Sequence, residues 1–288
     1  MAKNIRIIPR LDIKGPNLVK GIHLEGLRVL GKPEQYAGFY YEEGADELLY
    51  MDVVASLYNR HSLHDLITRT AKNIFIPLTV GGGLRSVDDI KNVLRAGADK
   101  VSLNTAAVNN PGIIREASRR FGSSTIIVSI EAVKRGDGKF IACTDNGRED
   151  TGLEAVEWAK KVEELGAGEI MITSIDREGT GAGYDTVLTR IISEAVSIPV
   201  IACGGAGSPE HIEKAITEGM ADAVAISSVL HYDFIKHHKV EMNKTVEGNV
   251  EFLESGKVFS RIKPANLKEI KTYLFQKGHS CRYIRDEA

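Results

Sequence analysis

The sequence has few cysteines and no long apolar segment, and each absence excludes a class of protein. Only three cysteines, Cys143, Cys203 and Cys281, occur in 288 residues, and none belongs to a CxxC pair. Their number and spacing argue against a zinc site, a redox dithiol or a disulfide framework, so we predict reduced thiols and neither a metal nor a cofactor. No apolar run approaches the roughly 20 residues of a membrane-spanning helix, and the N-terminus has no signal-peptide pattern.

Positive charge is not in excess either. The formal net charge is −2, and no run of five or more like charges occurs, so the sequence lacks the signature of a protein that binds nucleic acid or a membrane surface. We therefore expect a cytoplasmic protein whose partners are small molecules or another protein. The chain is 43% hydrophobic, and its length allows one large core, so we expect a single domain over residues 1–288.

Short apolar runs rich in β-branched residues alternate with longer amphipathic stretches such as VDDIKNVLRA at 87–96. Continuous apolar strands separated by helices are typical of parallel strands that are buried on both faces. The predicted strands are 5–13, 47–54, 76–80, 100–103, 125–130, 169–175, 199–203 and 222–226.

Two segments do not fit this alternation. Residues 133–150 (VKRGDGKFIACTDNGRED) contain two glycine turn signals around a short apolar strand, which predicts a β-hairpin inserted in the fifth strand-to-helix loop. Residues 232–263 form an extra, mostly polar segment between the eighth strand and the last helix. We expect this segment to be a loop or a small helix over one face of the protein.

An internal repeat sharpens the prediction of the fold. The stretch PLTVGGGLRSVDDIKNVLRAGADKVSLNTAA from Pro77 resembles PVIACGGAGSPEHIEKAITEGMADAVAISSVL from Pro199, with Gly82 aligned on Gly205. Two similar halves, each with four strand-helix units, predict a single (β/α)₈ TIM barrel built from two half-barrels. An open, doubly wound parallel sheet is the alternative.

In each half, a strand runs into a glycine cluster and then into a helix. Glycine lets the backbone approach an anion closely, and the N–H groups of the following helix favour negative charge. The sequence therefore predicts two phosphate cradles, and hence a substrate with a phosphate at each end, although such turns also need glycine for purely structural reasons. The predicted cradle residues, including polar groups that follow neighbouring strands, are Gly82, Gly83, Asn104, Thr105, Gly204, Gly205, Ser227 and Ser228.

Acidic residues end two strands that face each other across an eight-stranded barrel. Asp12 follows the first strand and Glu131 the fifth, so the pair can act as general acid and general base on a substrate that lies across the mouth. A salt bridge to a nearby lysine or arginine is the structural alternative for either residue. Asp52 and Asp176 also end strands, and Lys20 is placed to reach a phosphate over the mouth, unless it is only a solvated loop charge.

Four charged residues lie near strand starts, at the opposite end of the predicted barrel. They are near the starts of the first, second, fourth and sixth predicted strands: Arg6, Glu47, Lys100 and Glu169. Their spacing is compatible with an ion-pair ring that closes the bottom of the barrel. From spacing alone, stability of the N-terminal face is the simpler interpretation.

Several segments of the sequence resemble those of a known family. The strings IPRLDIKGPNLVKGIHLEGLR, GADELLYMDVVAS, PLTVGGGLRS, GADKVSLNTAAV, TSIDREGTGAGYD and IACGGAGSPEH are similar to the cyclase subunit of imidazole glycerol phosphate synthase, over about residues 5–231. The resemblance implies a barrel in a heterodimer with a glutaminase subunit, which docks on the N-terminal face and supplies ammonia. The ammonia reacts with a bisphosphorylated phosphoribulosyl-formimino carboxamide ribotide in histidine biosynthesis.

The resemblance also implies roles for single residues. It makes Asp12 one catalytic carboxylate, places Lys20 on the mobile loop that covers the substrate, and turns the four-residue ring into a gate for ammonia. In the motif IDREGT, we expect Asp176, Gly179 and Thr180 to contact the substrate.

This chain departs from the family pattern on the catalytic face. Glu131 and Glu178 stand where the family has aspartates, Val29 and Lys32 replace two aspartates of the first loop, and Arg10 replaces a cysteine. The extra methylene of Glu131 moves the carboxylate by about 1 Å, enough in principle to cost roughly a hundredfold in rate.

These departures leave three functions open. The first is a working cyclase joined to a glutaminase. The second is a paralogue that receives ammonia through the same gate for amidation of a sugar in surface-polysaccharide synthesis. The third is a catalytically silent scaffold that activates the glutaminase.

Overall fold

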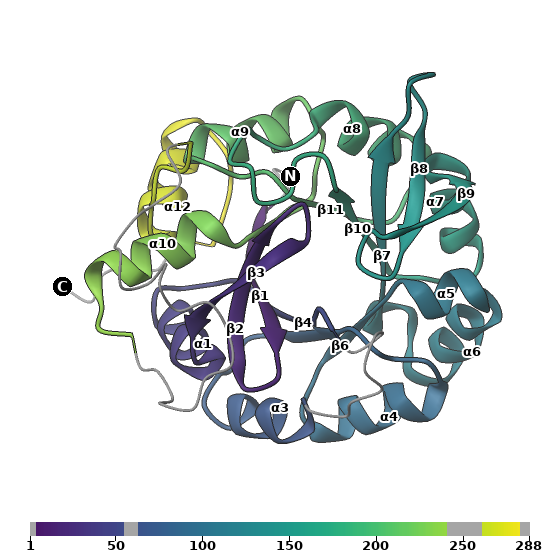
Figure 1. Ribbon diagram of the computed structural model, residues 1–288, viewed down its shortest axis with the longest axis horizontal. Helices are drawn as coiled ribbons and strands as arrows, with labels where there is room; N and C mark the ends of the chain where they lie inside the picture. Colours follow the sequence, from purple (N-terminus) through teal and green to yellow (C-terminus); the bar gives the residue numbers. More distant parts are fainter. Residues whose placement is uncertain (1–3, 55–62, 241–260, 283–288) are drawn as a thin grey trace.

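The computed structural model describes residues 4–54, 63–240 and 261–282, and a closed ring of parallel strands forms its centre (Figure 1). Successive barrel strands pair in parallel, β7 pairs with β10, and β12 pairs with β1 to close the ring. The predicted (β/α)₈ barrel is therefore confirmed. The barrel strands are β1 (Arg6–Lys14), β4 (Leu48–Asp52), β5 (Leu78–Gly81), β6 (Lys100–Leu103), β7 (Ile126–Lys134), β10 (Glu169–Ser174), β11 (Val200–Cys203) and β12 (Ala223–Ile226).

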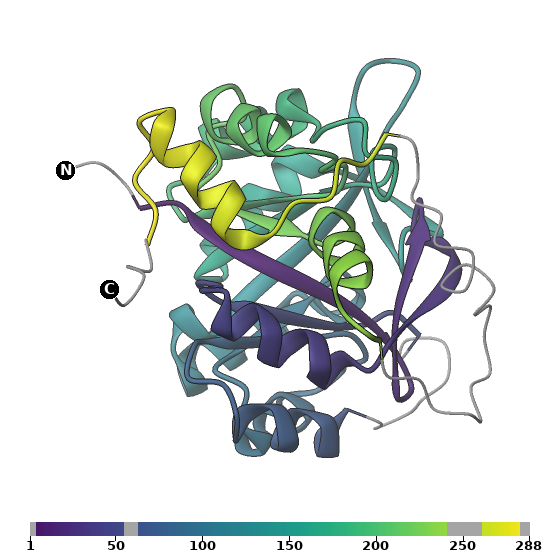
Figure 2. The ribbon, with the colours of Figure 1, turned by 90° about the vertical axis from the view of Figure 1, so that its left-hand side faces the viewer.

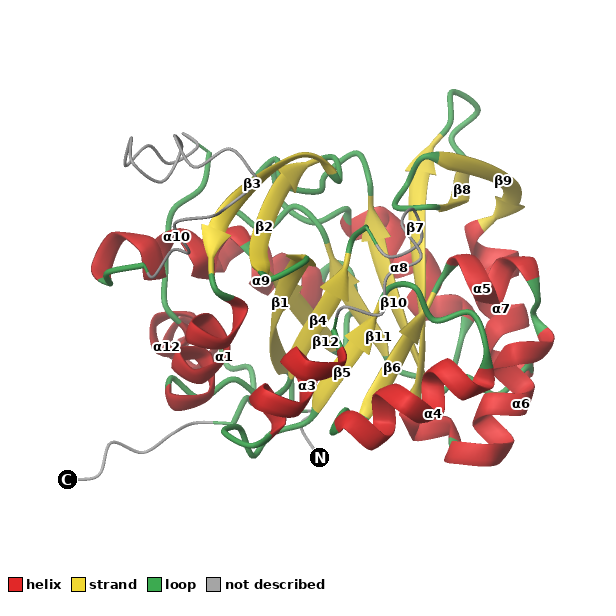
Figure 3. Ribbon diagram, turned by 60° about the horizontal axis from the view of Figure 1, so that its bottom comes forward, coloured by secondary structure: helices red, strands yellow, loops and turns green. Residues whose placement is uncertain are grey.

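Helices surround the strands on the outside (Figure 3). Within the described residues, none of them is both long and apolar enough to cross a membrane. The helices are α1 (Pro33–Glu42), α3 (His64–Ala71), α4 (Val87–Ala96), α5 (Thr105–Asn109), α6 (Gly112–Phe121), α7 (Ala155–Glu164), α8 (Thr186–Ala195), α9 (Pro209–Thr217), α10 (Ser228–His237) and α12 (Leu267–Gln276), with a 3₁₀ turn at Ser123–Thr125.

The first strand shows how the barrel divides its side chains. Neighbouring residues of a strand point to opposite faces. Ile7 packs in the core between strands and helices, whereas Ile8 packs with Met171 inside the barrel. Arg10 and Asp12 share the parity of Ile8, so β1 directs both of these charged side chains inward.

The two halves repeat one stabilising contact. Asp99 precedes β6 and accepts a hydrogen bond from the backbone N–H of Leu78 at 2.9 Å. Asp222 occupies the same place before β12 and accepts from the N–H of Val200 at 2.8 Å. Each carboxylate satisfies the first N–H of the preceding barrel strand, which a strand start otherwise leaves open. The two halves therefore share a structural contact as well as a similar sequence.

Two antiparallel additions rise at the C-terminal ends of the strands. A hairpin of β2 (Asn17–Ile22) and β3 (Glu25–Gly31) continues β1 over the mouth. This hairpin lies at the opposite end of the molecule from α12 and the start of β1 (Figure 2). The predicted hairpin at 133–150 comprises the end of β7, β8 (Phe140–Thr144) and the start of β9 (Glu149–Glu154).

The extra segment at 232–263 begins later than we predicted. Residues 232–237 form the second half of barrel helix α10, where Tyr232 and Phe234 are buried. Val229 with Tyr232 and Leu230 with Phe234 lie three and four residues apart, which is the spacing of a packed helix, and the polar residues around them obscured this pattern. Residues 241–260 of this segment lie outside the described residues.

Candidate functional site

The two predicted acid-base residues lie on opposite strands of the barrel. Asp12 is on β1 and Glu131 on β7, with three barrel strands between them on either side of the ring. Both side chains are buried. They differ in what surrounds each carboxyl group, and this difference decides their chemistry.

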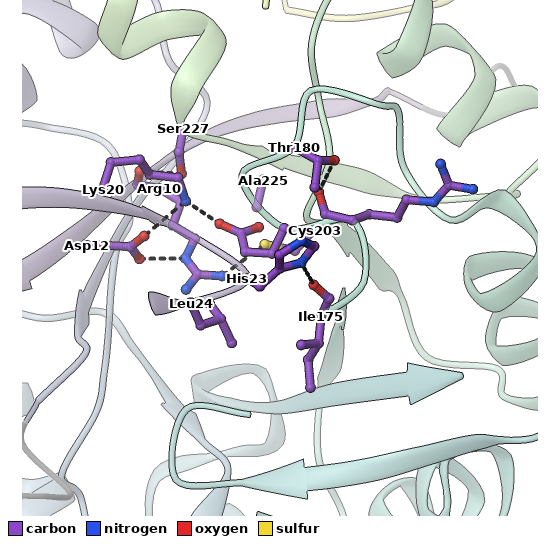
Figure 4. Close-up of polar contacts among 12 residues, drawn as sticks. Arg10, Asp12, Lys20, His23, Leu24, Ile175, Thr180, Cys203, Ala225 and Ser227 are labelled. Carbon is purple, nitrogen blue, oxygen red and sulfur yellow. Dashed lines mark hydrogen bonds and ion pairs between the residues drawn. The ribbon is translucent and has the colours of Figure 1, made fainter. Parts of the chain in front are cut away.

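Asp12 lies in a network of buried ion pairs (Figure 4). Arg10 Nε donates to Asp12 Oδ1 at 2.8 Å, and Lys20 Nζ donates to Asp12 Oδ2 at 3.2 Å. Lys20 also pairs with Glu178. Burial alone would raise the pKa of Asp12, but the charges of Arg10 and Lys20 and their hydrogen bonds outweigh it, so the pKa lies below its ordinary value. Asp12 is therefore a carboxylate at neutral pH.

Glu131 has no such partner. Its Oε2 atom has no hydrogen-bond partner among the residues that the structure describes. Burial raises the pKa of Glu131 to about 7, although the charge of Arg10 opposes the rise. A carboxyl group with a pKa near neutrality can both donate and accept a proton at physiological pH.

The first predicted cradle opens into a large cavity. Gly82, Gly83, Asn104 and Thr105 line a cavity of about 420 Å³ together with Glu131. This volume is within the usual range of small-molecule sites. The structure therefore brings one cradle and one acid-base residue to the same cavity. Its wall also includes residues that the sequence did not single out as site residues, among them Arg85, Asp145 and Asn146.

Both cradles need glycine for a specific steric reason. Gly82 has a φ of 95°, and a Cβ atom there would lie 2.2 Å from the backbone oxygen of Asp52. Gly205 has a φ of 107°, and a Cβ atom there would lie 2.2 Å from the backbone oxygen of Gly183. The chain passes too close to its neighbours at both turns for any side chain.

The second predicted cradle is nearly filled by protein. Its cavity measures only about 10 Å³. Lys20 and Glu178 occupy its wall, and a Cβ atom on Gly204 would lie 3.1 Å from Glu178 Oε2. A carboxylate this close opposes a bound phosphate unless Lys20 stays between them. The predicted residues in this wall are Gly179, Gly204, Gly205, Ser227 and Ser228.

Three predicted residues lie apart from the cavities or make different contacts. Asp176 accepts from the N–H of Lys134 at 2.9 Å and lines neither cradle. Thr180 donates to the backbone oxygen of Arg177 at 2.6 Å and likewise lines neither cradle. Lys20 is in strand β2 rather than in a loop, and its buried ammonium group faces acids.

The four charges at the strand starts form a closed ring at the floor of the barrel. Arg6 donates to Glu47 and to Glu169 at 2.6 Å each. Lys100 lies 3.1 Å from Glu47 and 2.7 Å from Glu169. Burial would raise the pKa of Glu169, but the hydrogen bonds and charges of Arg6 and Lys100 lower it. Every charge of the ring thus has two partners of opposite sign.

A small cavity lies directly inside this ring. It measures about 10 Å³, and Glu47, Thr79 and Ser102 line it among apolar residues. Ser102 also lines the large cavity that contains Glu131. The hydroxyl groups of Ser102 and Ser129 are buried without a hydrogen-bond partner in the described part of the chain. Polar, unpartnered groups therefore mark the interior between the floor and the mouth.

Comparison with known proteins places this geometry in a family. Residues 6–236 match the family described as histidine biosynthesis protein. The imidazole glycerol phosphate synthase subunit HisF of Legionella pneumophila is 58% identical over 207 residues, which are 72% of this chain and 98% of that protein. The HisF subunit of Methanocaldococcus jannaschii is 50% identical over 246 residues, 79% of this chain and 90% of its own. The chain therefore belongs to the histidine biosynthesis protein family and is a relative of the HisF subunit of imidazole glycerol phosphate synthase.

Proposed function

We propose that this chain is the cyclase-type subunit of an imidazole glycerol phosphate synthase, a lyase coupled to a glutamine amidotransferase. In this reaction, ammonia combines with a bisphosphorylated phosphoribulosyl-formimino carboxamide ribotide. The product of the addition is cyclised and cleaved to imidazole glycerol phosphate and an aminoimidazole carboxamide ribotide. The similarity to HisF subunits over most of the barrel supports this assignment.

The position of Ser102 is the observation that best supports ammonia as a substrate. This residue lines both the small cavity beside Glu47 and the large cavity beside Glu131. Its unpartnered hydroxyl can accept a hydrogen bond from ammonia or donate one to it. In the proposal, ammonia enters through the ring at the floor, passes Ser102 and reaches the substrate beside Glu131.

The substrate is proposed to lie across the mouth between the cradles. One phosphate binds at Gly83 and Asn104, in the large cavity. The other is proposed to bind at Gly205 and Ser228, once the β2–β3 hairpin moves enough to admit it while Lys20 stays between the phosphate and Glu178. Ring closure requires protons to move between nitrogen and oxygen atoms of the substrate, and a pair consisting of one carboxylate and one group with a pKa near neutrality suits that task.

A glutaminase subunit is proposed to dock on the N-terminal face, in a heterodimer. The four-residue ring lies at this face. Phe75, in the loop before β5, is 80% exposed, and Met220, in the loop before β12, is 47% exposed. Large apolar side chains exposed on the same face as the ring suit a protein interface.

The test uses the chain with and without a HisH-type glutaminase. Purified chain supplied with ammonium salt and the ribotide should form imidazole glycerol phosphate. Addition of the glutaminase should then allow glutamine to replace ammonium. Absence of product under both conditions would contradict the cyclase assignment.

Amidation of a sugar is the second candidate, and two residues favour it. Arg10 contacts Asp12, and Glu131 replaces the shorter aspartate that the family resemblance implies, so the acid pair has a different environment from that of a standard cyclase. This candidate predicts a chain that binds and activates a glutaminase, forms no imidazole product, and supplies ammonia to a separate sugar-modifying enzyme. Activation of the glutaminase without transfer of ammonia to any acceptor would instead indicate the silent scaffold.

A further inference from the structure

Arg10 is held rigidly beside Asp12 inside the barrel. It is two residues from Asp12 on the same face of β1 and is 1% exposed. Its Nε atom donates to Asp12 at 2.8 Å, and its Nη1 atom contacts Cys203 Sγ at 3.1 Å (Figure 4). Two contacts on different edges fix the planar guanidinium. Its orientation therefore depends on Asp12 and on strand β11.

The buried charged groups around Asp12 include more acids than cations. The buried cations that face Asp12 are Arg10 and Lys20, and the buried acids are Asp12, Glu178 and Glu131. Two further titratable groups near the cluster do not alter the count: burial lowers the pKa of His231 to about 3 and raises that of the Cys203 thiol, so both are neutral.

Three acids thus share two cations, and all five side chains are buried. Unpaired charge is costly in such surroundings, and the acid that lacks a cation partner is the one that takes up a proton. Arg10 and Lys20 both contact Asp12, and Lys20 also contacts Glu178. Glu131 contacts neither cation and has an unpartnered oxygen.

We propose that Arg10 is a positioning residue that keeps Asp12 ionised and thereby makes Glu131 the member of the acid pair that carries the exchangeable proton. This inference rests on the proposed function, because it assigns roles within that active site. Without Arg10, three acids would share the single charge of Lys20, and a second proton would enter the cluster. Asp12 would receive it, because Lys20 lies closer to Glu178 than to Asp12.

The protonation of Asp12 can be measured without turnover. Chain labelled with ¹³C at the aspartate carboxyl carbons is titrated by NMR, and the Asp12 signal is identified by its absence from Asp12→Asn. In Arg10→Met, the midpoint of the Asp12 titration should rise by about one to three pH units, the usual effect of losing an adjacent opposite charge. Arg10→Lys should restore most of this shift. Cys203→Ala, which removes only the other contact of Arg10, should titrate like the unmodified chain.

An unchanged midpoint in Arg10→Met would overturn the proposal, as would an equal rise in Cys203→Ala. If Arg10→Met does not fold, Arg10→Gln, which also removes the charge, takes its place: a rise of the same size supports the proposal and an unchanged midpoint overturns it. Formation of imidazole product is measured separately. Failure of the cyclase assignment would appear as absent turnover, with the titration still informative.

Discussion

Arg6 on β1 reaches Glu169 on β10 at 2.6 Å, although β11 and β12 lie between these strands in the ring. The contact therefore spans the floor of the barrel rather than joining neighbouring strands. Glu47 pairs with both Arg6 and Lys100, and Lys100 pairs with Glu169, so the ion pairs form a closed ring. Anything that enters the interior through this floor must separate at least one ion pair, so the ring is the natural place to test passage of ammonia.

Charge reversal in the ring should uncouple the two nitrogen sources. In Lys100→Glu, three acids face Arg6 alone, and repulsion should distort the floor. We expect product formation from glutamine, measured with the glutaminase present, to fall by about tenfold or more, while formation from added ammonium persists. Lys160→Glu, which changes an exposed lysine on α7, is the matched control and should leave both rates unchanged. Equal loss of both rates in Lys100→Glu would identify the ring as a structural feature only.

The acid pair gives a second prediction. Asp12→Asn and Glu131→Gln should each lower the ammonia-dependent formation of imidazole glycerol phosphate by about 10²-fold or more, the usual scale for a positioned acid or base. Glu131→Asp should be neutral or faster, because it restores the length of the family's carboxylate. Steady-state rates with saturating ammonium measure all three. A rate that is indifferent to Asp12→Asn would mean an active barrel with another mechanism.

Glu131 should also make stability depend on pH. The folded pKa is about 7 and the ordinary value is 4.5, so the folded chain binds more protons than the unfolded chain between these values. The free energy of unfolding should therefore fall as pH rises from 4.5 to 7, by about 3 kcal/mol from this group. Glu131→Gln should remove this loss, being more stable than the unmodified chain at pH 8 and similar to it at pH 4.5. Urea denaturation of both proteins at pH 4.5 and pH 8 measures these free energies of unfolding. If the free energy changes equally between the two pH values in both proteins, Glu131 is already ionised in the folded state.

Phosphate binding gives the fourth prediction. Crystals soaked in phosphate should show one anion near Gly83 and Asn104 and another near Gly205 and Ser228. The second site should be the weaker, because Glu178 lies against Gly204. Removing its charge in Glu178→Gln should strengthen phosphate binding there by about tenfold and leave the first site unchanged, as followed by calorimetry. A single anion site in both proteins would rule out a substrate with a phosphate at each end.

The features of this protein that could be predicted from sequence are those that repeat or alternate locally. The eight barrel strands follow from apolar runs at regular intervals, and the duplicated glycine turns follow from the alignment of Gly82 with Gly205. The charges at the strand starts were also visible, because a barrel sends the first inward residue of each strand to one floor. The start of the segment at 232–263 was wrong because a short apolar spacing lay within a polar stretch.

By itself, the sequence determined the barrel, its two ends and the residue types at each end, since these depend on periodicity along the chain. Only the tertiary structure decided the charge state of the acid pair. Lys20 and Glu178 are 158 residues apart in the sequence, yet their contact and that of Arg10 with Asp12 determine which carboxyl group is ionised. A pKa depends on burial and on the sum of nearby charges. Arg10 shares β1 with Asp12, but the other charges come from segments that are far apart in the sequence.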